Sequence, residues 1–243
     1  MPDCPDFVTI DAYGRPPGGN VRWRHQVRQA LASHLPGLRA ATVNHANNGT
    51  HAMIPRVVPA GSALVMAWES REAAEAAWCG PLRGLMNGRG AFSLDGEVVR
   101  SRAETDGDNW HGWSPRAGAA EALDAKEPLV AIVHGVLHPR NLVRFLRNNA
   151  HAASRAAHHP GHRGSIDISS QLPFEHTSIS LWKTLKLAQD YAYAPGGHAT
   201  AMSHARTQHT HRTGVYVQVR PLASSGSLGL AEPAFPDLPA ARR

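Results

Sequence analysis

Residues 62–70 read SALVMAWES, and residues 176–184 read HTSISLWKT. Each stretch has the length and apolar content of a buried strand, contains a tryptophan near its end and leads into residues that favour a helix. The two stretches align at a constant offset of about 114 residues, which places Trp68 on Trp182. We interpret this repeat as an internal duplication.

The same order of elements extends outward from both stretches. Each half is expected to start with a strand and a helix, and to close with a strand after a break at Gly and Pro. In chain order these segments are FVTIDAY (7–13), VRWRHQVRQALASHL (21–35), GEVVRSRAE (96–104), PLVAIVHGVLHP (128–139), RNLVRFLRNNAHAASRAA (140–157) and GVYVQVRPL (214–222). With further strands expected in between, each half reads β-α-β-β-α-β, which is the ferredoxin-like arrangement.

The predicted fold class is therefore α+β, with two tandem ferredoxin-like β-α-β-β-α-β repeats that form one domain resembling a dimeric α+β barrel. The space between a sheet and its helices is a natural pocket in such a domain. The predicted boundaries are a first half over 1–104, a connector over 105–127, a second half with the candidate site over 128–222, and a flexible tail over 223–243. The tail is assigned because it is rich in Ser, Gly, Ala and Pro.

Composition limits the classes of protein that this chain can be. Of its 243 residues, 42% are hydrophobic, and no apolar run reaches the roughly 20 residues that a membrane-spanning helix needs. The N-terminus, MPDCPDFVTI, lacks a signal-peptide pattern, so we expect a cytoplasmic protein. Its net charge of +6 comes from scattered Lys and Arg, so no nucleic-acid partner is expected. Cys4 and Cys79 lack zinc-type spacing and are expected to be reduced thiols.

Common catalytic motifs are missing from the sequence. It contains no G-x-S-x-G, no P-loop, no G-x-G-x-x-G after a strand and no segment of paired carboxylates. Hydrolase, kinase and dinucleotide-binding interpretations therefore lose support.

Histidine is the residue type whose placement suggests chemistry. The chain has 16 histidines, and His198 opens a helical stretch after a Pro-Gly-Gly break, with Met202 on the same face at i, i+4. A neutral imidazole can hold haem iron from one side. The alternative is that His198 is a surface or capping residue. His176 and His134 border or lie within expected strands, where a pocket role and a hydrogen-bonded core role are both open.

A set of segments resembles spheroidene monooxygenase and its relatives over roughly residues 6 to 225. The most specific part is the strand that ends at Trp182, followed by a helix, an aromatic-alanine-aromatic run and Gly-His-Ala. The segments are PGLRAAT (36–42), GSALVMAWESREAAEAAW (61–78), NWHGWSP (109–115), PLVAIVHGVLHPRNLVRFLRN (128–148), TSISLWKTLKLAQDYAYAPGGHATAM (177–202) and VYVQVRPL (215–222).

The resemblance implies a haem-containing monooxygenase that introduces oxygen into carotenoids, with haem b as the cofactor. By position, His198 is the candidate iron ligand, and Gly84 occupies the equivalent place in the first half. Met202 and Trp182 complete the expected cofactor-binding set. The chain departs from the family after this helix, where it reads TQHTHRTGVYV (207–217), so a smaller or anionic substrate suits it better than a carotenoid.

We therefore expect a haem-dependent monooxygenase or related oxidative enzyme that acts on a small organic metabolite. His176 and Arg212 are the candidate catalytic residues, assisting proton transfer. An electron donor is a possible partner, and the protein is expected as a monomer or homodimer. The alternatives are a haem-dependent dehydratase or rearrangement enzyme, a cofactor-free α+β barrel enzyme such as a cyclase, and a binding protein without activity.

Overall fold

The computed structural model describes residues 4–14, 19–47, 61–85, 91–105, 107–118, 122–194, 211–228 and 233–241, and the statements below refer to these residues. In the first half the elements are β1 (Phe7–Tyr13), α1 (Asn20–Ala32), β2 (Leu38–Asn47), β3 (Gly61–Trp68), α2 (Arg71–Cys79) and β4 (Ala91–Ala103). In the second half they are β5 (Leu129–Leu137), the 3-10 turn η1 (Pro139–Asn141), α3 (Leu142–Ala157), β6 (His162–Ser169), β7 (Glu175–Trp182), α4 (Leu185–Tyr193) and β8 (His211–Ser225).

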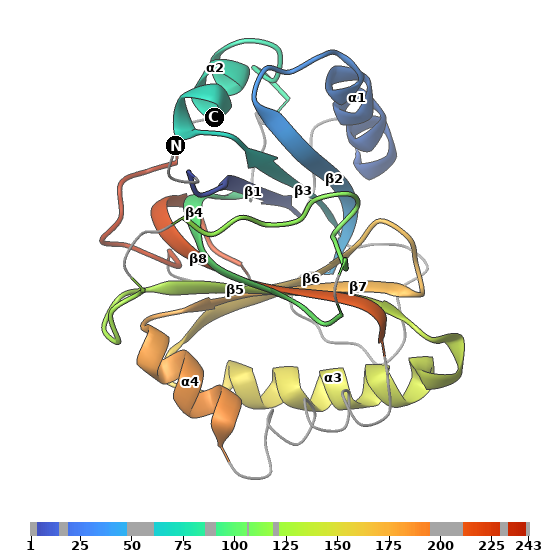
Figure 1. The fold of residues 1–243 in the computed structure, drawn as a ribbon, viewed down its shortest axis with the longest axis vertical. Coiled ribbons are helices and arrows are strands. Elements are labelled where there is room, and N and C mark those ends of the chain that lie inside the picture. Colours follow the sequence, from blue (N-terminus) through green and yellow to red (C-terminus); the bar gives the residue numbers. More distant parts are fainter. Residues whose placement is uncertain are drawn as a thin grey trace.

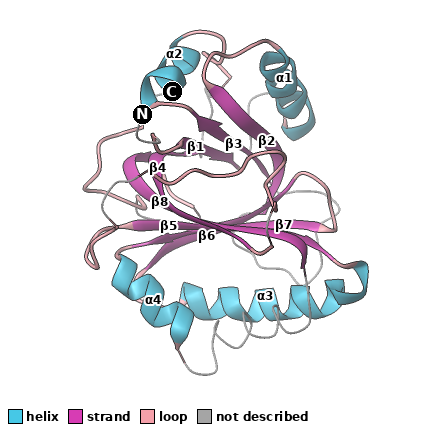
Figure 2. Ribbon diagram, in the orientation of Figure 1, coloured by secondary structure: helices cyan, strands magenta, loops and turns pink. Residues whose placement is uncertain are grey.

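The strands form a closed antiparallel barrel in the order β1-β3-β2-β6-β7-β5-β8-β4. β2 pairs with β6 and β4 pairs with β8, so these two ladders join the halves, and β1 pairs with β4 to complete the first half. Helices α1 and α2 cover the barrel on one side, and α3 and α4 cover it on the other (Figures 1 and 2). The prediction of a mixed helix and sheet barrel is confirmed.

The two halves share one order of elements and one order of strands. The first half runs β4-β1-β3-β2 across its sheet, and the second runs β8-β5-β7-β6. Ser70 caps α2, because its side chain accepts a hydrogen bond from the Ala73 N–H, and Thr184 caps α4 in the same way. The origin of the two halves by duplication stays a prediction.

Apolar side chains from all eight strands fill the barrel interior. The strand residues of this core are mainly valine, isoleucine and leucine, as expected for positions that face inward on every second residue. Trp110 and Trp113 come from the connector and insert into the same core. Ala234 and Phe235 also lie buried there, so this part of the C-terminal segment, which was expected to be a flexible tail, packs on the barrel.

The buried carboxylate of Asp6 fixes the connector to the barrel. It accepts hydrogen bonds from the Trp113 indole N–H at 2.7 Å and from the Arg116 backbone N–H at 3.0 Å. The Arg39 guanidinium lies 3.2 Å away, and Asp6 itself is fully buried. Since a buried charge needs partners, Asp6 and the groups around it stabilise one another.

No helix of the described part is long and apolar enough to span a membrane.

Replacing Asp6 should therefore destabilise the fold strongly. Asp6→Ala removes the acceptor of two hydrogen bonds and leaves Arg39 without its buried partner, so the free energy of unfolding should fall by about 3 kcal/mol. The measurement is urea unfolding followed by tryptophan fluorescence. Asp190→Ala, which breaks an exposed pair with Lys186, is the control and should change stability by less than about 0.5 kcal/mol. Equal effects of the two substitutions would contradict the role of Asp6.

Candidate functional site

The outward faces of the two half-barrels differ in how completely they are covered. Every residue of β1 and β3 is buried, on both faces of the strand. In β5 and β7, half-buried or exposed residues stand between buried ones. Val133, on the central strand β5, remains 37% exposed although a helix layer lies over this sheet. The outward face of the second half is therefore less completely covered than that of the first.

The cause is the size of the outward side chains. At the repeat offset, Leu64 and Met66 of β3 correspond to Ser178 and Ser180 of β7. Both first-half residues are fully buried against α1 and α2, whereas both serines are half-buried. Large apolar groups in the first half are thus replaced by small polar groups in the second.

A glycine extends this row of small residues. Tyr13 pairs with Ser62 in the first half, and at the equivalent place Gly135 pairs with His176. A Cβ on Gly135 would lie 2.4 Å from the ring of His211, so glycine is needed for the close approach of that ring. We call this surface the α3 face; it consists of Ala131, Val133, Gly135, His176, Ser178, Ser180, Tyr216 and Gln218.

Helix α3 covers the α3 face without packing tightly against it. Of its 16 residues only Ala156 is buried. Its apolar stripe, which includes Phe145 and Leu146, stays half-buried. The layer between α3 and the sheet is therefore less tightly packed, among the described residues, than the layer over the first half.

His176 lies at the edge of the α3 face and is held by polar partners. Its Nε2 atom is 3.3 Å from the Asp167 carboxylate and 3.2 Å from the Asn149 side-chain amide. The ring of Phe145 packs edge-on against it, with centroids 4.9 Å apart. This predicted catalytic residue is therefore an oriented imidazole beside a carboxylate, at the edge of the α3 face.

A second histidine–carboxylate pair lies on the other side of Phe145. His211 Nδ1 is 3.3 Å from Glu104, and its ring packs on Phe145 with centroids 5.6 Å apart. The α3 face is thus bordered by two imidazoles that each have an acidic partner. An imidazole beside a carboxylate is an arrangement that enzymes use for proton transfer.

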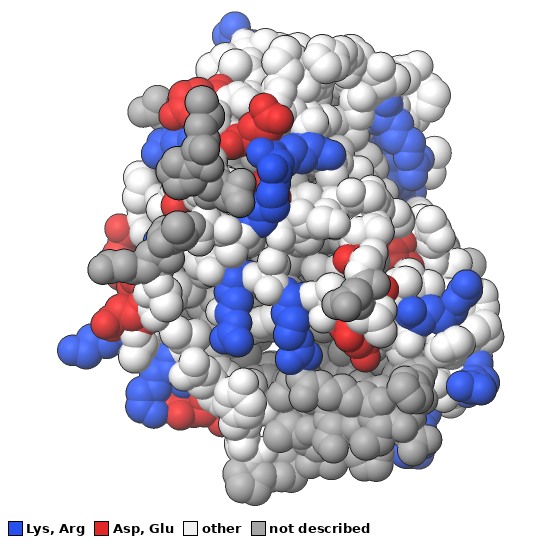
Figure 3. All heavy atoms as spheres, in the orientation of Figure 1, with Lys and Arg blue, Asp and Glu red and all other residues white. Residues whose placement is uncertain are grey.

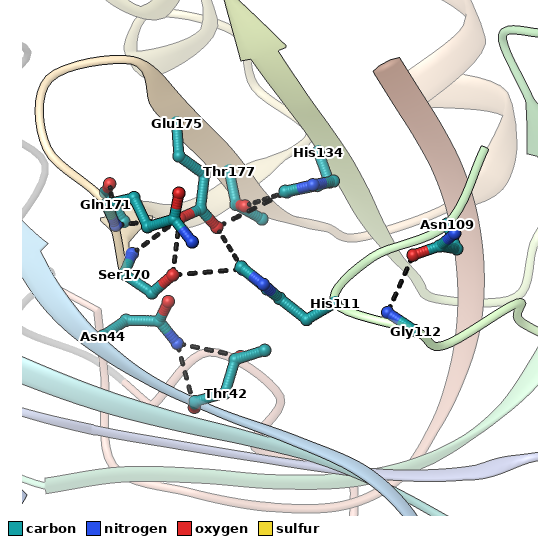
Figure 4. A network of polar contacts seen from close by, with 11 residues as sticks. Thr42, Asn44, Asn109, His111, Gly112, His134, Ser170, Gln171, Glu175 and Thr177 are labelled. Carbon is teal, nitrogen blue, oxygen red and sulfur yellow. Dashed lines mark hydrogen bonds and ion pairs between the residues drawn. The ribbon is translucent and has the colours of Figure 1, made fainter.

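A different polar network occupies the interior at one mouth of the barrel, where Figure 4 shows it. The Glu175 carboxylate accepts hydrogen bonds from His111 Nε2 at 2.8 Å, from the Ser170 hydroxyl and backbone N–H, and from the Gln171 N–H at 2.9 Å. Burial opposes its ionisation, but the hydrogen bonds from His111 and Ser170 lower the pKa of Glu175 overall. The network joins the connector to the β6–β7 turn.

His111 reaches Glu175 because of a tight turn in NWHGWSP. Trp110 and Trp113 exchange backbone hydrogen bonds, and the residues between them, His111 and Gly112, have φ of 51° and 83°. Two positive φ values are the signature of a type I′ turn, which Gly readily adopts and His tolerates. Both tryptophans enter the core while the turn presents His111, whose pKa is raised by its hydrogen bond to Glu175.

His134 is the deepest member of this network. It is 3% exposed, its Nδ1 lies 2.8 Å from the Thr177 hydroxyl, and its ring stacks on Trp110 with centroids 5.3 Å apart. Burial lowers the pKa of His134 to about 4, so it is neutral at physiological pH. Of the two roles left open by the sequence, the structure supports a hydrogen-bonded core histidine.

The structure brings some of the predicted site residues together but not all. Trp182 is buried beside the α3 face, donates its indole N–H to Ser180 Oγ at 2.9 Å and packs on Tyr191. Arg212 is exposed and has no hydrogen bond or ion pair among the described residues. His198 and Met202 lie outside the described residues. Gly84 lies after α2 with φ of 83°, in the first half.

Three residues around the site were not anticipated from the sequence. No role was assigned to His111, Glu175 or Glu104, although His111 stands in a segment quoted for the family resemblance. His111 and Glu175 are 64 positions apart, so only the closed barrel brings them into contact. In the part of the chain that the structure describes, no group of three or more His, Cys, Asp and Glu side chains is arranged to hold a metal ion.

Comparison with known proteins supports the fold. No protein-family model matches the chain, and no curated protein matches it by sequence. Among solved structures it is similar to an aldoxime dehydratase, with a TM-score of 0.55 and 9% identity over 90% of this chain and 82% of that chain. An aldoxime dehydratase in complex with butyraldoxime gives a TM-score of 0.53 and 8% identity over 90% of this chain and 80% of that chain.

A further similarity has a lower TM-score. A heme-degrading enzyme from Listeria monocytogenes matches over 87% of this chain and 98% of that chain, with 13% identity and a TM-score of 0.30. At these identities the similarity to the dehydratases establishes a shared fold and nothing more specific. The resemblance to spheroidene monooxygenase is not confirmed by these comparisons.

The buried His134 should make the fold sensitive to acid. Its folded-state pKa lies below the ordinary value of 6.5, so the stability that depends on neutral His134 is complete above pH 6.5 and is lost as pH falls toward 4. His134→Gln should reduce the loss of unfolding free energy between pH 7 and pH 4.5 by on the order of 2 kcal/mol. Urea unfolding at a series of pH values measures this loss. His25→Gln, at an exposed position on α1, is the control; an unchanged pH profile in His134→Gln would contradict the assignment.

Proposed function

We propose that this protein is a haem-dependent oxidative enzyme of monooxygenase type that binds haem b in the layer between α3 and the α3 face. The observation that carries the proposal is the row of small residues at Gly135, Ser178 and Ser180, where the first half has large ones. This row leaves room for a broad, flat, mainly apolar group under a half-buried apolar helix stripe. The choice of haem comes from the family resemblance.

The described residues fit such a group in their chemistry. The α3 face offers small side chains in its centre, the buried Trp182 on one side and the apolar stripe of α3 opposite. His198, which follows α4 in the sequence, is the proposed iron ligand, and Met202 comes four positions further along the chain. When bound, haem would supply redox-active iron for oxygen chemistry.

His176 is the proposed proton-transfer residue of this site. Its ring is held by Asp167 and Asn149, so Nε2 has a fixed direction and lies beside a carboxylate. The helix α3 and the ring of Phe145 restrict access of water to this imidazole. Arg212, exposed at the start of β8, is the proposed source of positive charge at the rim for an anionic small-molecule substrate.

A second reaction class follows from the fold comparison. Because the chain shares its fold with aldoxime dehydratases, dehydration is the alternative reaction to assay at the same layer. It needs proton transfer by a residue such as His176 but no electron donor. A monooxygenase reaction needs an external reductant, so the dependence of turnover on reductant separates the two classes.

Haem binding through His198 is the first test. Protein supplied with haem should show a Soret band, and His198→Ala should lose it or shift it strongly, because a histidine ligand sets the electronic state of the iron. The absorption spectrum is the measurement. His209→Ala, eleven positions further along the chain, is the control and should keep the wild-type spectrum. A colourless wild type would contradict the haem proposal.

Filling the layer is the second test, and it does not depend on which residue binds iron. Ser178→Leu combined with Ser180→Met gives β7 the outward residues of β3, so haem affinity should fall at least about tenfold because the space is occupied. The same variant should unfold at a higher temperature, because burying two apolar side chains contributes about 1.5–3 kcal/mol each. Unchanged haem affinity in a folded double variant would place the ligand elsewhere.

A further inference from the structure

The last part of β4 belongs to the second half of the barrel. β4 pairs with β1 as far as Glu97 and then continues along β8 to Ala103. Its pairing with β8 shifts register between Val98 and Arg100, which marks a β-bulge. The outward residues of this segment therefore extend the α3 face by one strand.

The bulge decides where two arginines point. Val98 faces the barrel interior and is fully buried, so simple alternation would send residues 100 and 102 inward as well. The extra residue at the bulge reverses the alternation, and Arg100 and Arg102 pair with the outward residues Gln218 and Tyr216. Both arginines are exposed, side by side on one face and about 7 Å apart along the strand.

Neither guanidinium is neutralised within the described residues. Arg100 and Arg102 have no hydrogen bond or ion pair there, and the acids of this face have other partners: Glu104 pairs with His211, and Glu127 with Arg220. Figure 3 shows Lys and Arg side chains over the region of β4 and β8. Two adjacent like charges without a partner repel each other unless an anion binds between them.

Tyr216 adds a hydrogen-bond donor beside the two arginines. The Gln218 side-chain amide donates to the Tyr216 hydroxyl oxygen at 2.9 Å, which leaves the phenolic O–H available as a donor. Burial raises the pKa of Tyr216, so the phenol keeps its proton at physiological pH. Two cations and one neutral donor on neighbouring positions are a suitable set for carboxylate oxygens.

Strand pairing connects Arg100, Arg102 and Tyr216 directly to the layer between α3 and the α3 face. Arg102 pairs with Tyr216, and Tyr216 pairs with the exposed Val133 at the centre of the α3 face. Two strand spacings, or about 10 Å, separate Arg102 from Val133. The far side of the same row ends at Asp167, so the row is positive at one end and acidic at the other.

We propose that Arg100, Arg102 and Tyr216 bind the carboxylate groups of a ligand whose apolar body lies in the layer under α3. The inference rests on the proposed function in that it uses the same layer. Two ligands could carry these carboxylates: haem, through its propionates, or an amphipathic carboxylic acid substrate. In both cases the anionic end of the ligand points toward β4 and away from Asp167.

The first experiment compares haem with haem dimethyl ester, in which both carboxylates are blocked, by Soret titration in the same dilute detergent. Wild-type protein should bind haem at least about tenfold more tightly than the ester. Arg100→Gln combined with Arg102→Gln should bind both equally, at the affinity of the ester. Arg22→Gln combined with Arg28→Gln removes the same charge from exposed positions on α1 and should keep the preference.

The second experiment covers a carboxylate on the substrate and does not need haem to bind. The rise in melting temperature with dodecanoate is compared with that with dodecanol for the same three proteins. A preference for dodecanoate that is lost only in the Arg100/Arg102 variant supports the carboxylate site even where haem and its ester bind alike. A wild type without a Soret band would overturn the haem proposal alone. If the Arg100/Arg102 variant matches wild type in both experiments, the carboxylate site is wrong.

Discussion

Closure of the barrel by hydrogen bonds between the halves is the constraint on which the other features depend. Because β2 pairs with β6 and β4 with β8, the sheet has no free edge, and each strand residue faces either the interior or a helix layer. The interior is filled by aliphatic side chains and by the tryptophans of the connector. Room for a large ligand therefore has to come from a helix layer, and the outward residues of each half decide which one.

The network around Glu175 illustrates why a dense cluster of titratable groups need not be the site of chemistry. Its carboxylate already accepts hydrogen bonds from His111, Ser170 and Gln171, so little acceptor capacity is left for a substrate. The Glu175 carboxylate and the Ser170 hydroxyl both contact the same nitrogen of His111, Nε2, so the imidazole does not connect the two groups as it would in a nucleophilic triad. The network instead holds the type I′ turn in the barrel mouth.

The sequence predicted the elements well because each is encoded locally. The strands that end at Trp68 and Trp182, and the residues after them that favour a helix, are each recognised from residues within one segment. The same repeat aligns Leu64 and Met66 with Ser178 and Ser180. This difference in side-chain size could have indicated the candidate site from the sequence alone. The bulge that turns Arg100 outward could not be predicted, since it is a property of pairing with β8 and not of β4 alone.

The incomplete filling of the second half has an energetic consequence that favours a binding role. Burying a side chain the size of leucine or methionine stabilises a fold by about 1.5–3 kcal/mol, and the first half gains this at both equivalent positions. The second half lacks that gain, and only Ala156 of α3 is buried. A ligand that occupies this layer would bury Val133 and the helix stripe and so stabilise only the folded state. Binding of a ligand in this layer would therefore raise the free energy of unfolding of the second half, as expected for a ligand that binds only the folded state.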